Sequence, residues 1–282
     1  MIQWYPGHMA KAKRILKEDL KLIDLVVEVL DARIPSSSRN PDLDELLQNK
    51  ERIVVLNKID LADKALTLSW EEFLQRKFSV VKINSLEGEG VQELLGLIEE
   101  RGRVINRAIQ KRGRRSRDIR IMILGIPNVG KSALINVLAG ISITKTGNKP
   151  GVTRGRQWIK VGERIQLLDT PGILWPKFED EDVGYKLALT GAVSDDIFDQ
   201  ELAAYKLIEY LLAIDRGILE EGYGIEIKTD QPYDILPLIG RKRGCLMSGG
   251  KVDRSRASRT LINDFRKGKL GPVTLEKPVM EA

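Results

Sequence analysis

One eight-residue segment constrains the fold of this chain more than any other. Gly125-Ile-Pro-Asn-Val-Gly-Lys-Ser132 matches the pattern of a glycine, four residues, a second glycine, a lysine and a serine or threonine, which forms a phosphate-binding loop. An apolar run over residues 119–124 precedes it, and a helix-forming run over residues 132–138 follows it. The sequence therefore predicts a strand, a phosphate loop (residues 125–132) and a helix in direct succession.

The residues of the phosphate loop suit a nucleotide with a bound metal ion. Gly125 and Gly130 permit backbone angles that turn N–H groups onto phosphate oxygens, at the positive end of the following helix. Lys131 reaches the β- and γ-phosphates and is a predicted catalytic residue, and the Ser132 hydroxyl is placed to bind Mg²⁺. The expected nucleotide contacts in this loop are Asn128, Val129, Gly130, Lys131, Ser132 and Ala133.

Two segments after the phosphate loop predict the switches of such a site. In Asp169-Thr-Pro-Gly172 the carboxylate can hold Mg²⁺, usually through water, and the Gly172 N–H can meet the γ-phosphate. Between the phosphate loop and this segment lies Lys149-Pro-Gly-Val-Thr153, whose threonine hydroxyl can bind Mg²⁺ when a γ-phosphate is present. The predicted magnesium ligands are therefore Ser132, Thr153 and Asp169.

Two segments before the phosphate loop predict the choice of base. The base loop, Asn57-Lys-Ile-Asp60, follows an apolar run. The Asp60 carboxylate can accept two hydrogen bonds from guanine that adenine cannot donate. Asn57 can bridge to the phosphate loop, and the stem of Lys58 can cover the face of the base. A weaker motif, whose backbone N–H meets guanine O6, is predicted at Asn84, Ser85 and Leu86.

The order of these motifs is permuted relative to the Ras-like GTPases, which they resemble. In that family the phosphate loop comes first and the base motifs come last, whereas here the base motifs precede it. The same sheet results if the old termini are joined, through residues 91–118, and the chain is cut just after Gly172. The second switch then leads directly into the C-terminal part of the chain.

Alternating strands and helices predict an α/β fold with ligands at the carboxyl ends of the strands. We expect helices over residues 11–22, 42–48, 70–76, 91–109 and 132–138, and strands over residues 25–30, 52–56, 80–83, 119–124, 158–161 and 165–168. After about residue 178 only helical periodicity is found, over 201–214 and 255–266. The predicted domains are a permuted GTPase domain, 1–178, and a smaller helical RNA-binding domain, 179–282.

Charge and composition indicate which binding partners and which cellular compartment to expect. The net charge is +6, with nine Lys/Arg and one acid in residues 101–120 and ten Lys/Arg and two acids in residues 241–269. Two basic segments beside a phosphate motif favour RNA as a partner. No run approaches the roughly 20 apolar residues that span a bilayer, and the start lacks a signal-peptide layout, so a cytoplasmic protein is expected. The single cysteine, Cys245, excludes an internal disulfide and is expected to be buried.

The chain resembles the circularly permuted GTPases, and within them the ribosome biogenesis GTPase A family (RbgA/YlqF). The resemblance covers nearly the whole chain and rests on Trp4-Tyr-Pro-Gly-His-Met-Ala-Lys-Ala12, Asp31-Ala-Arg33, Asn57–Asp60, Gly125–Ser132, Pro150–Thr153, Asp169–Gly172, Asp253, Asp264-Phe-Arg and Gly268-Lys-Leu-Gly. It implies GTP hydrolysis during late maturation of the large (50S) ribosomal subunit, stimulated by the ribosome, with the helical domain on ribosomal RNA. The permuted GTPases that carry a zinc site do not fit a chain with one cysteine.

The same resemblance implies two features of hydrolysis. An aliphatic residue, Ile173, follows Gly172 where Ras-type enzymes have the water-orienting glutamine. The only histidine, His8, lies in a motif whose histidine has a catalytic role in the family, and it is the predicted residue that holds the attacking water. Asn128 is a possible K⁺ site beside the phosphates, and the alternative is that it only caps the turn.

Two other functions stay open on the sequence alone. The chain could be an RNA-binding scaffold that holds GTP structurally, or a regulatory GTPase that acts on a protein partner. Mg²⁺-dependent turnover of GTP in the presence of RNA-bearing particles distinguishes the scaffold from the enzyme. Sedimentation with precursors of the large subunit distinguishes the regulatory GTPase from the assembly factor.

Overall fold

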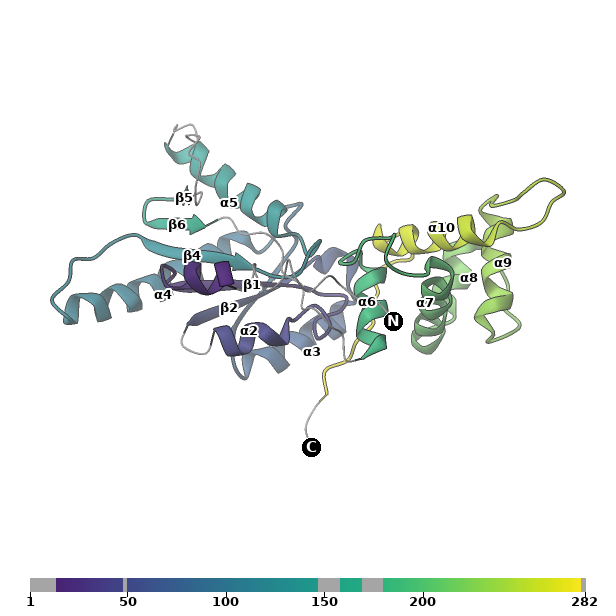
Figure 1. Ribbon diagram of the computed structural model, residues 1–282, viewed down its shortest axis with the longest axis horizontal. Helices are drawn as coiled ribbons and strands as arrows, with labels where there is room; N and C mark the ends of the chain where they lie inside the picture. Colours follow the sequence, from purple (N-terminus) through teal and green to yellow (C-terminus); the bar gives the residue numbers. More distant parts are fainter. Residues whose placement is uncertain (1–13, 48–49, 147–157, 169–179, 280–282) are drawn as a thin grey trace.

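The described part of the protein contains a six-stranded sheet with helices on both faces and a group of helices at its carboxyl edge (Figure 1). The computed structural model describes residues 14–47, 50–146, 158–168 and 180–279. The strands are β1 (Leu25–Asp31), β2 (Glu51–Asn57), β3 (Ser79–Ile83), β4 (Ile119–Leu124), β5 (Trp158–Val161) and β6 (Ile165–Leu168). All six strands predicted from the sequence are confirmed to within one residue at each end.

The strand order β3-β2-β1-β4-β6-β5 is that of an open α/β sheet. All neighbours are parallel except β5, which pairs antiparallel with β6 as the predicted hairpin. From the centre, the chain runs outward through β1, β2 and β3 on one side, and through β4 and then the hairpin on the other. Ligands bind in such sheets at the carboxyl ends of the strands where this direction reverses, here between β1 and β4.

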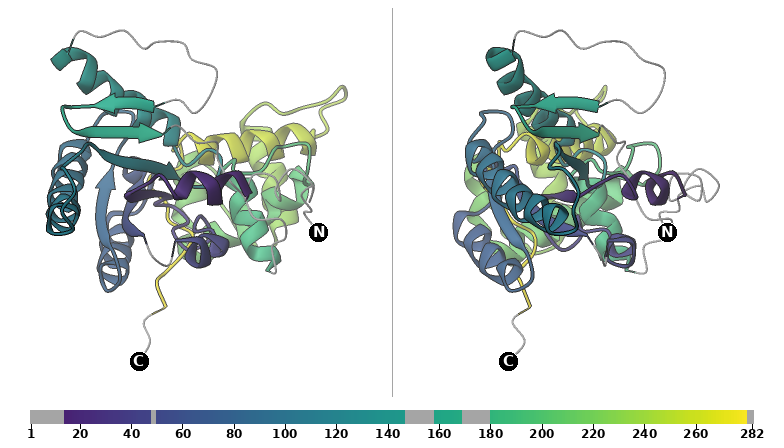
Figure 2. Two further views of the ribbon diagram at one scale, coloured as in Figure 1. Left: turned by 60° about the vertical axis from the view of Figure 1, so that its left-hand side comes forward. Right: turned by 90° about the vertical axis from the view of Figure 1, so that its left-hand side faces the viewer.

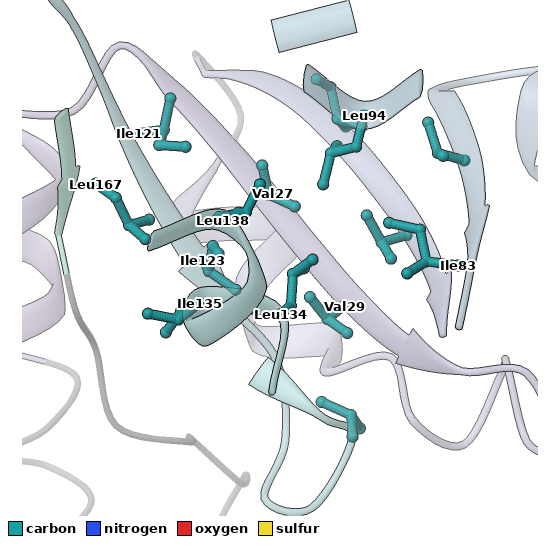
Figure 3. Packing of buried hydrophobic residues seen from close by; sticks show 14 of the residues in the cluster. Val27, Val29, Ile83, Leu94, Ile121, Ile123, Leu134, Ile135, Leu138 and Leu167 are labelled. Carbon is teal, nitrogen blue, oxygen red and sulfur yellow. The ribbon is translucent and has the colours of Figure 1, made fainter. Parts of the chain in front are cut away.

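Helices cover the two faces because the strand residues alternate between them. Residues 14–20 form a helix, and the further helices around the sheet are α2 (Pro41–Leu46), the short 3-10 helix η1 (Ile59–Leu61), α3 (Lys64–Gln75), α4 (Val91–Lys111) and α5 (Lys131–Thr146). Val27 and Val29 face α4 and α5, whereas Val26 and Leu30 face the helices on the other side. Figure 3 shows Leu134, Ile135 and Leu138 of α5 lying over Val27, Ile121 and Ile123. The permuted α/β fold class is confirmed.

Most of the residues after 180 form a group of helices with a core of its own. Its helices are α6 (Glu181–Leu189), α7 (Gln200–Ile214), α8 (Gly217–Tyr223), α9 (Pro232–Lys242) and α10 (Arg254–Arg266). Their apolar faces form a second core around Leu207, Leu211 and Leu261, in which Cys245 is buried as expected. Aspartates cap the first turns, since the carboxylates of Asp199 and Asp253 accept from N–H groups of α7 and α10.

Contacts cross the predicted boundary between residues 178 and 179. Leu187 and Ala188 of α6 belong to the core of the sheet rather than to the helical core. The C-terminal tail, residues 272–279, runs back from the helical group along the carboxyl edge of the sheet (Figure 2). There the Val273 N–H donates to the Leu61 carbonyl and the Leu275 N–H donates to the Arg33 carbonyl. The boundary itself stays a prediction.

Several helices differ from the sequence-based expectations. Helix α3 begins at Lys64, six residues before the predicted start, because the Asp63 carboxylate caps it by accepting from the Leu66 N–H (2.8 Å). Helix α5 continues to Thr146. Helices α6, α8 and α9 were not predicted individually, because two are short and Pro237 lies inside α9.

Candidate nucleotide-binding site

The phosphate loop lies at this reversal point of the sheet, between the end of β4 and the start of α5. Gly125 has φ +154° and Gly130 has φ +100°, in the left-handed half of backbone space that glycine favours. Both also lie too close to neighbours for a side chain, since an added Cβ at Gly125 would lie 2.5 Å from the Val29 carbonyl oxygen. An added Cβ at Gly130 would lie 2.2 Å from the Asn57 amide nitrogen. The loop is therefore held against β1 and the base loop.

The two polar residues after Gly130 start α5 at the loop. The Lys131 ammonium is largely buried and donates to the Ile126 carbonyl at 2.7 Å, so the side chain folds back over the loop. Ser132 is exposed in the first turn of α5, where the helix presents N–H groups and a partial positive charge. A loop with glycine-type backbone angles, a lysine across it and a hydroxyl in the first turn of the following helix suits a polyphosphate with Mg²⁺.

Asn57 joins the phosphate loop to both base motifs. Its fully buried amide nitrogen donates to the Val129 carbonyl (2.7 Å) and to the Ser85 hydroxyl (3.1 Å). Its amide oxygen accepts from the Ser85 N–H (3.1 Å). Three segments that are far apart in the sequence thus meet at one side chain, as the sequence predicted for Asn57 and the phosphate loop.

The remaining base residues lie around this junction. Lys58 is in the left-handed region (φ 63°, ψ 39°), so the chain turns sharply after β2 and η1 presents Asp60 to solvent. Leu86 is exposed, and its N–H donates to the Asn84 side-chain oxygen at 3.1 Å. The N–H groups of Ser85 and Leu86 thus both donate to side chains of the protein, and their contact with guanine O6 stays a prediction.

A buried cluster beneath the base loop was not assigned a role from the sequence. The Asp31 carboxylate, at the end of β1, pairs in two places with the Arg33 guanidinium (2.8 and 2.9 Å) and accepts from the Lys58 ammonium (2.8 Å). Burial raises the pKa of Asp31, but the charges of Arg33 and Lys58 outweigh it and hold the pKa well below its usual range. Burial lowers the pKa of Lys58, which Asp31 only partly offsets. The carboxylate is therefore ionised and fixes the Lys58 stem.

Asn128 connects the phosphate loop to the helical group. It has a left-handed backbone (φ 59°), and its amide nitrogen donates to the Gly191 carbonyl just after α6. The chain therefore turns at Asn128, as the left-handed backbone requires. Because the amide nitrogen is used by Gly191, the side-chain oxygen is the atom that could face a cation. The signal for this contact was weak in the sequence, because Gly191 lies in no recognisable motif.

Several predicted residues lie outside the described residues. These are His8, Thr153, Asp169 and Gly172. Within the described ranges, no group of three or more His, Cys, Asp or Glu side chains could hold a metal ion, and no helix is long and apolar enough to cross a membrane. Of the three predicted magnesium ligands, only Ser132 is therefore placed.

The sheet order, the phosphate loop and the base motifs joined at Asn57 define a phosphate-loop GTPase with permuted motifs. Comparisons with known proteins agree: residues 120–214 match the family model described as "50S ribosome-binding GTPase". The chain is 49% identical over 98% of its length to ribosome biogenesis GTPase A of Bacillus pumilus (99% of that protein covered). It is 34% identical over 98% of its length to the protein of that name from Thermotoga maritima, of which 95% is covered.

Solved structures give the same result. GNP-bound YlqF from T. maritima matches with a TM-score of 0.69 and 31% identity, over 95% of this chain and 99% of that one. The GDP-bound structure of T. maritima YlqF matches with a TM-score of 0.66 and 30% identity, over 94% and 99% of the two chains. The chain belongs to the ribosome biogenesis GTPase A family, which confirms the resemblance found in the sequence.

Proposed function

We propose that this chain hydrolyses GTP to GDP and phosphate as an assembly factor of the large (50S) ribosomal subunit. The observation that carries the GTP site is the junction at Asn57, which brings the phosphate loop within hydrogen-bonding distance of both base motifs. The proposed GTP contacts are Asn57, Lys58, Asp60, Asn84, Ser85, Leu86, Asn128, Val129, Gly130, Lys131, Ser132, Ala133, Thr153 and Gly172. The names of the relatives support the ribosomal role.

Magnesium is the proposed cofactor. The exposed Ser132 hydroxyl, with Thr153 and Asp169, would supply the hard oxygen ligands that Mg²⁺ prefers. The metal ion would neutralise charge on the β- and γ-phosphates while the γ-phosphoryl group is transferred to water. Lys131 already lies across the loop, where its ammonium can move onto the phosphate oxygens and stabilise the same charge.

His8 is proposed to hold the attacking water, because an imidazole can accept a water proton or orient the water by a hydrogen bond. We propose that the ribosome positions this residue at the phosphates. Intrinsic turnover should then be slow, on the order of 10⁻⁴–10⁻³ s⁻¹ as in Ras without its activator, and ribosomal particles should increase it.

A potassium ion at Asn128 is the proposed second cation. The Asn128 amide nitrogen donates to Gly191, which turns the side chain in a fixed direction and leaves its oxygen for the ion. A cation there would supply positive charge beside the phosphates, as an arginine finger does. Equal GTPase rates in KCl and NaCl would refute this proposal.

The helical domain, residues 179–282, is proposed to contact ribosomal RNA in the cytoplasm. Its basic segment over residues 241–269 is consistent with binding to phosphates. Because Asn128 and Arg33 both contact this part of the chain, a nucleotide-dependent movement at the phosphate loop would reorient it.

One experiment tests the proposed function as a whole. GTP turnover by the full chain is measured with Mg²⁺, alone and with large-subunit precursors, and the same mixtures are sedimented with GTP or GDP. We expect stimulation by the particles and nucleotide-dependent cosedimentation. Turnover that the particles do not change, or a preference for ATP, would contradict the proposal. His8→Ala with unchanged stimulated turnover would refute only the role of His8.

A further inference from the structure

We propose that the end of the GTPase domain opposite the helical group is a second RNA-binding surface, which takes a strand with an unstacked nucleotide. We call it the basic end: residues 103–117 and Arg164. The far end of α4 and the β5–β6 hairpin lie on one side of the molecule, and α7 to α10 lie on the other (Figure 1). This surface therefore goes beyond the helical RNA contact proposed above.

The basic end is formed because α4 continues past the sheet. Val91, Leu94, Ile98 and Gly102 are the buried positions of this helix, and no residue from 103 to 117 is buried. The exposed residues Arg103, Arg107 and Lys111 follow one another at intervals of four, so they form a row on one face with about 6 Å of rise between neighbours. A helix that only covered the sheet would not need these turns.

The segment after α4 is held in place rather than free. Gly113 is left-handed (φ +75°), its N–H donates to the Gln110 carbonyl, and the Arg114 N–H donates to the Ile109 carbonyl, which ends the helix. The Asn106 side chain exchanges two hydrogen bonds with the backbone of Arg117 (3.0 and 3.1 Å). The loop over 112–116 is thus fixed at both ends.

A second anchor fixes the end of this loop. The Arg117 guanidinium makes a two-point ion pair with Asp24 (2.7 Å each), at the start of β1. The other arginines are not used in this way. Throughout the described ranges, no acidic side chain lies within ion-pair distance of Arg103, Arg107, Arg112, Arg114 or Arg115. These five arginines are exposed and have no acidic partner among the described residues. This is the charge pattern of a phosphate-binding surface.

A crevice of about 490 Å³ opens beside these arginines, between α4 and the β5–β6 turn. Its floor is apolar, with Ile98, Ile119 and Ile165, and its rim carries Arg103, Arg107 and Arg164. This volume is in the range of small-ligand sites, so it admits one unstacked base. Arginine planes can stack on such a base, and single-stranded segments are where RNA presents one.

The chemistry favours RNA over an acidic protein. Eight of the nine basic residues in 101–120 are arginine, whose planar fork matches phosphate. Two carboxylates, Glu99 and Glu163, also line the crevice. They would repel an acidic peptide, but they can accept hydrogen bonds from base amino groups and from the ribose 2′-hydroxyl, which DNA lacks.

The test compares two variants of the full chain that carry the same change in net charge. In the first, Arg107, Arg112, Arg114 and Arg115 are replaced by Ser. In the control, the exposed residues Lys17, Lys21, Lys64 and Lys77 are replaced by Ser. Binding of a short labelled RNA strand is measured by fluorescence anisotropy at several salt concentrations, with the matching DNA strand and polyglutamate as competitors.

We expect the arginine variant to lose at least about tenfold in affinity, and its salt slope to fall by roughly 3, since each phosphate contact on a single strand contributes about 0.7. The control should lose about twofold or less. Photo-crosslinking of thiouridine RNA should label residues in 103–117 or 162–164. Equal losses in the two variants, crosslinks confined to the helical group, or equal competition by DNA or polyglutamate would each overturn the proposal.

GTP turnover provides the control for folding. None of the eight substituted side chains lies at the nucleotide site, so both variants should hydrolyse GTP at the wild-type rate. A wild-type chain that does not hydrolyse GTP would refute the proposed function and would leave this RNA test unaffected.

Discussion

The Lys58 ammonium lies 2.8 Å from the Asp31 carboxylate, which in turn pairs with the buried Arg33 guanidinium. Arg33 continues to the helical group, since its guanidinium lies over the Phe265 ring (5.3 Å to the centroid) and 3.5 Å from the Arg266 carbonyl oxygen. One buried carboxylate therefore connects the base loop to the end of α10. The Asp31-Ala-Arg33 motif, which the family resemblance singled out, makes this connection.

The tail and the turn after α10 add two further contacts to the same connection. The Thr274 hydroxyl accepts from the Asp63 N–H at 3.0 Å, and Gly268 lies so close to Leu61 that an added Cβ would meet its side chain at 2.6 Å. The segment from Leu61 to Asp63, just after the base loop, is thus held by residues more than 200 positions later. Changes in the helical group are expected to reach guanine binding by this route.

Asp31→Asn should destabilise the protein and weaken guanine nucleotide binding together. The amide removes the negative charge and leaves the Arg33 guanidinium buried without compensation, so the free energy of unfolding should fall by about 3 kcal/mol. Since Lys58 also loses its anchor, GDP affinity should fall by roughly tenfold. Urea denaturation and a fluorescent-GDP titration measure the two effects.

The matched control is Asp44→Asn, because Asp44 also bridges two arginines but is half exposed. It should cost about 0.5 kcal/mol and leave GDP affinity unchanged. A similar loss of GDP affinity in both variants would show that Asp31 has no special role at the base loop.

Gly130→Ala should abolish nucleotide binding, and Gly113→Ala should not. Both glycines have positive φ, so both substitutions strain the backbone by about 1 kcal/mol. Only at Gly130 would the new Cβ collide with a side chain, the Asn57 amide nitrogen at 2.2 Å, whereas nothing lies within 4 Å at Gly113. Isothermal titration with GDP measures the difference. Retained binding in the Gly130 variant would mean that the loop and Asn57 can separate without loss.

Stability should fall with increasing pH because of Glu28, which is buried in β1. Burial raises its pKa above the ordinary value of 4.5, and the positive charges of Arg52 and Arg39 offset this only in part. An acid with a raised pKa binds more protons in the folded chain, so the free energy of unfolding falls as pH rises through that pKa. Glu28→Gln should remove this loss, so the free energy of unfolding of the variant should change less than that of wild type between about pH 5 and pH 8.

Urea denaturation of wild type and variant at both pH values checks this expectation. Glu18→Gln is the control, because it removes the same charge from the exposed side of the helix over 14–20. Parallel profiles for wild type and the Glu28 variant would contradict the assignment.

Glu276→Gln should loosen the tail. The largely buried Glu276 carboxylate accepts from the N–H groups of Ser36 (2.7 Å) and Ser37 (3.2 Å) and lies 3.5 Å from the Lys186 ammonium of α6. Replacing one oxygen by an NH₂ group places a hydrogen-bond donor against these N–H donors. The free energy of unfolding should therefore fall by about 2 kcal/mol. Hydrogen exchange should also become faster at the Leu275 N–H.

Glu226→Gln is the control for the tail, because Glu226 pairs with Lys228 while most of its side chain is exposed. It should cost less than about 0.5 kcal/mol. An equal change in both variants would show that the tail contributes no more than a surface ion pair.

Local patterns in the sequence were enough to predict the phosphate loop, the strands and the base motifs. The runs before Gly125 and Asn57 are apolar on both faces, and a buried strand of this kind can be recognised from its composition. The caps and short helices were harder. Helix α3 starts at a single aspartate, Asp63, and α8 has only seven residues, too few for a clear period.

The long-range contacts could not be predicted, because the sequence does not contain distances. Glu276 follows no motif, yet it holds the loop at Ser36 and Ser37. Asp31 and Arg33 are recognisable as a pair, but their connection to Phe265 depends on where α10 packs. The crevice of the basic end likewise exists only because α4 and the β5–β6 turn lie side by side.

By itself, the sequence predicted which residues bind phosphate and guanine, since glycine backbones, a lysine and a carboxylate carry that chemistry wherever they lie. Only the tertiary structure decided that Asn57, Val129 and Ser85 meet, and that the helical group is tied to the base loop through Asp31 and Arg33. The physical reason is that the chemistry of a side chain is local, whereas a hydrogen bond about 3 Å long between distant residues depends on the packing of the whole sheet.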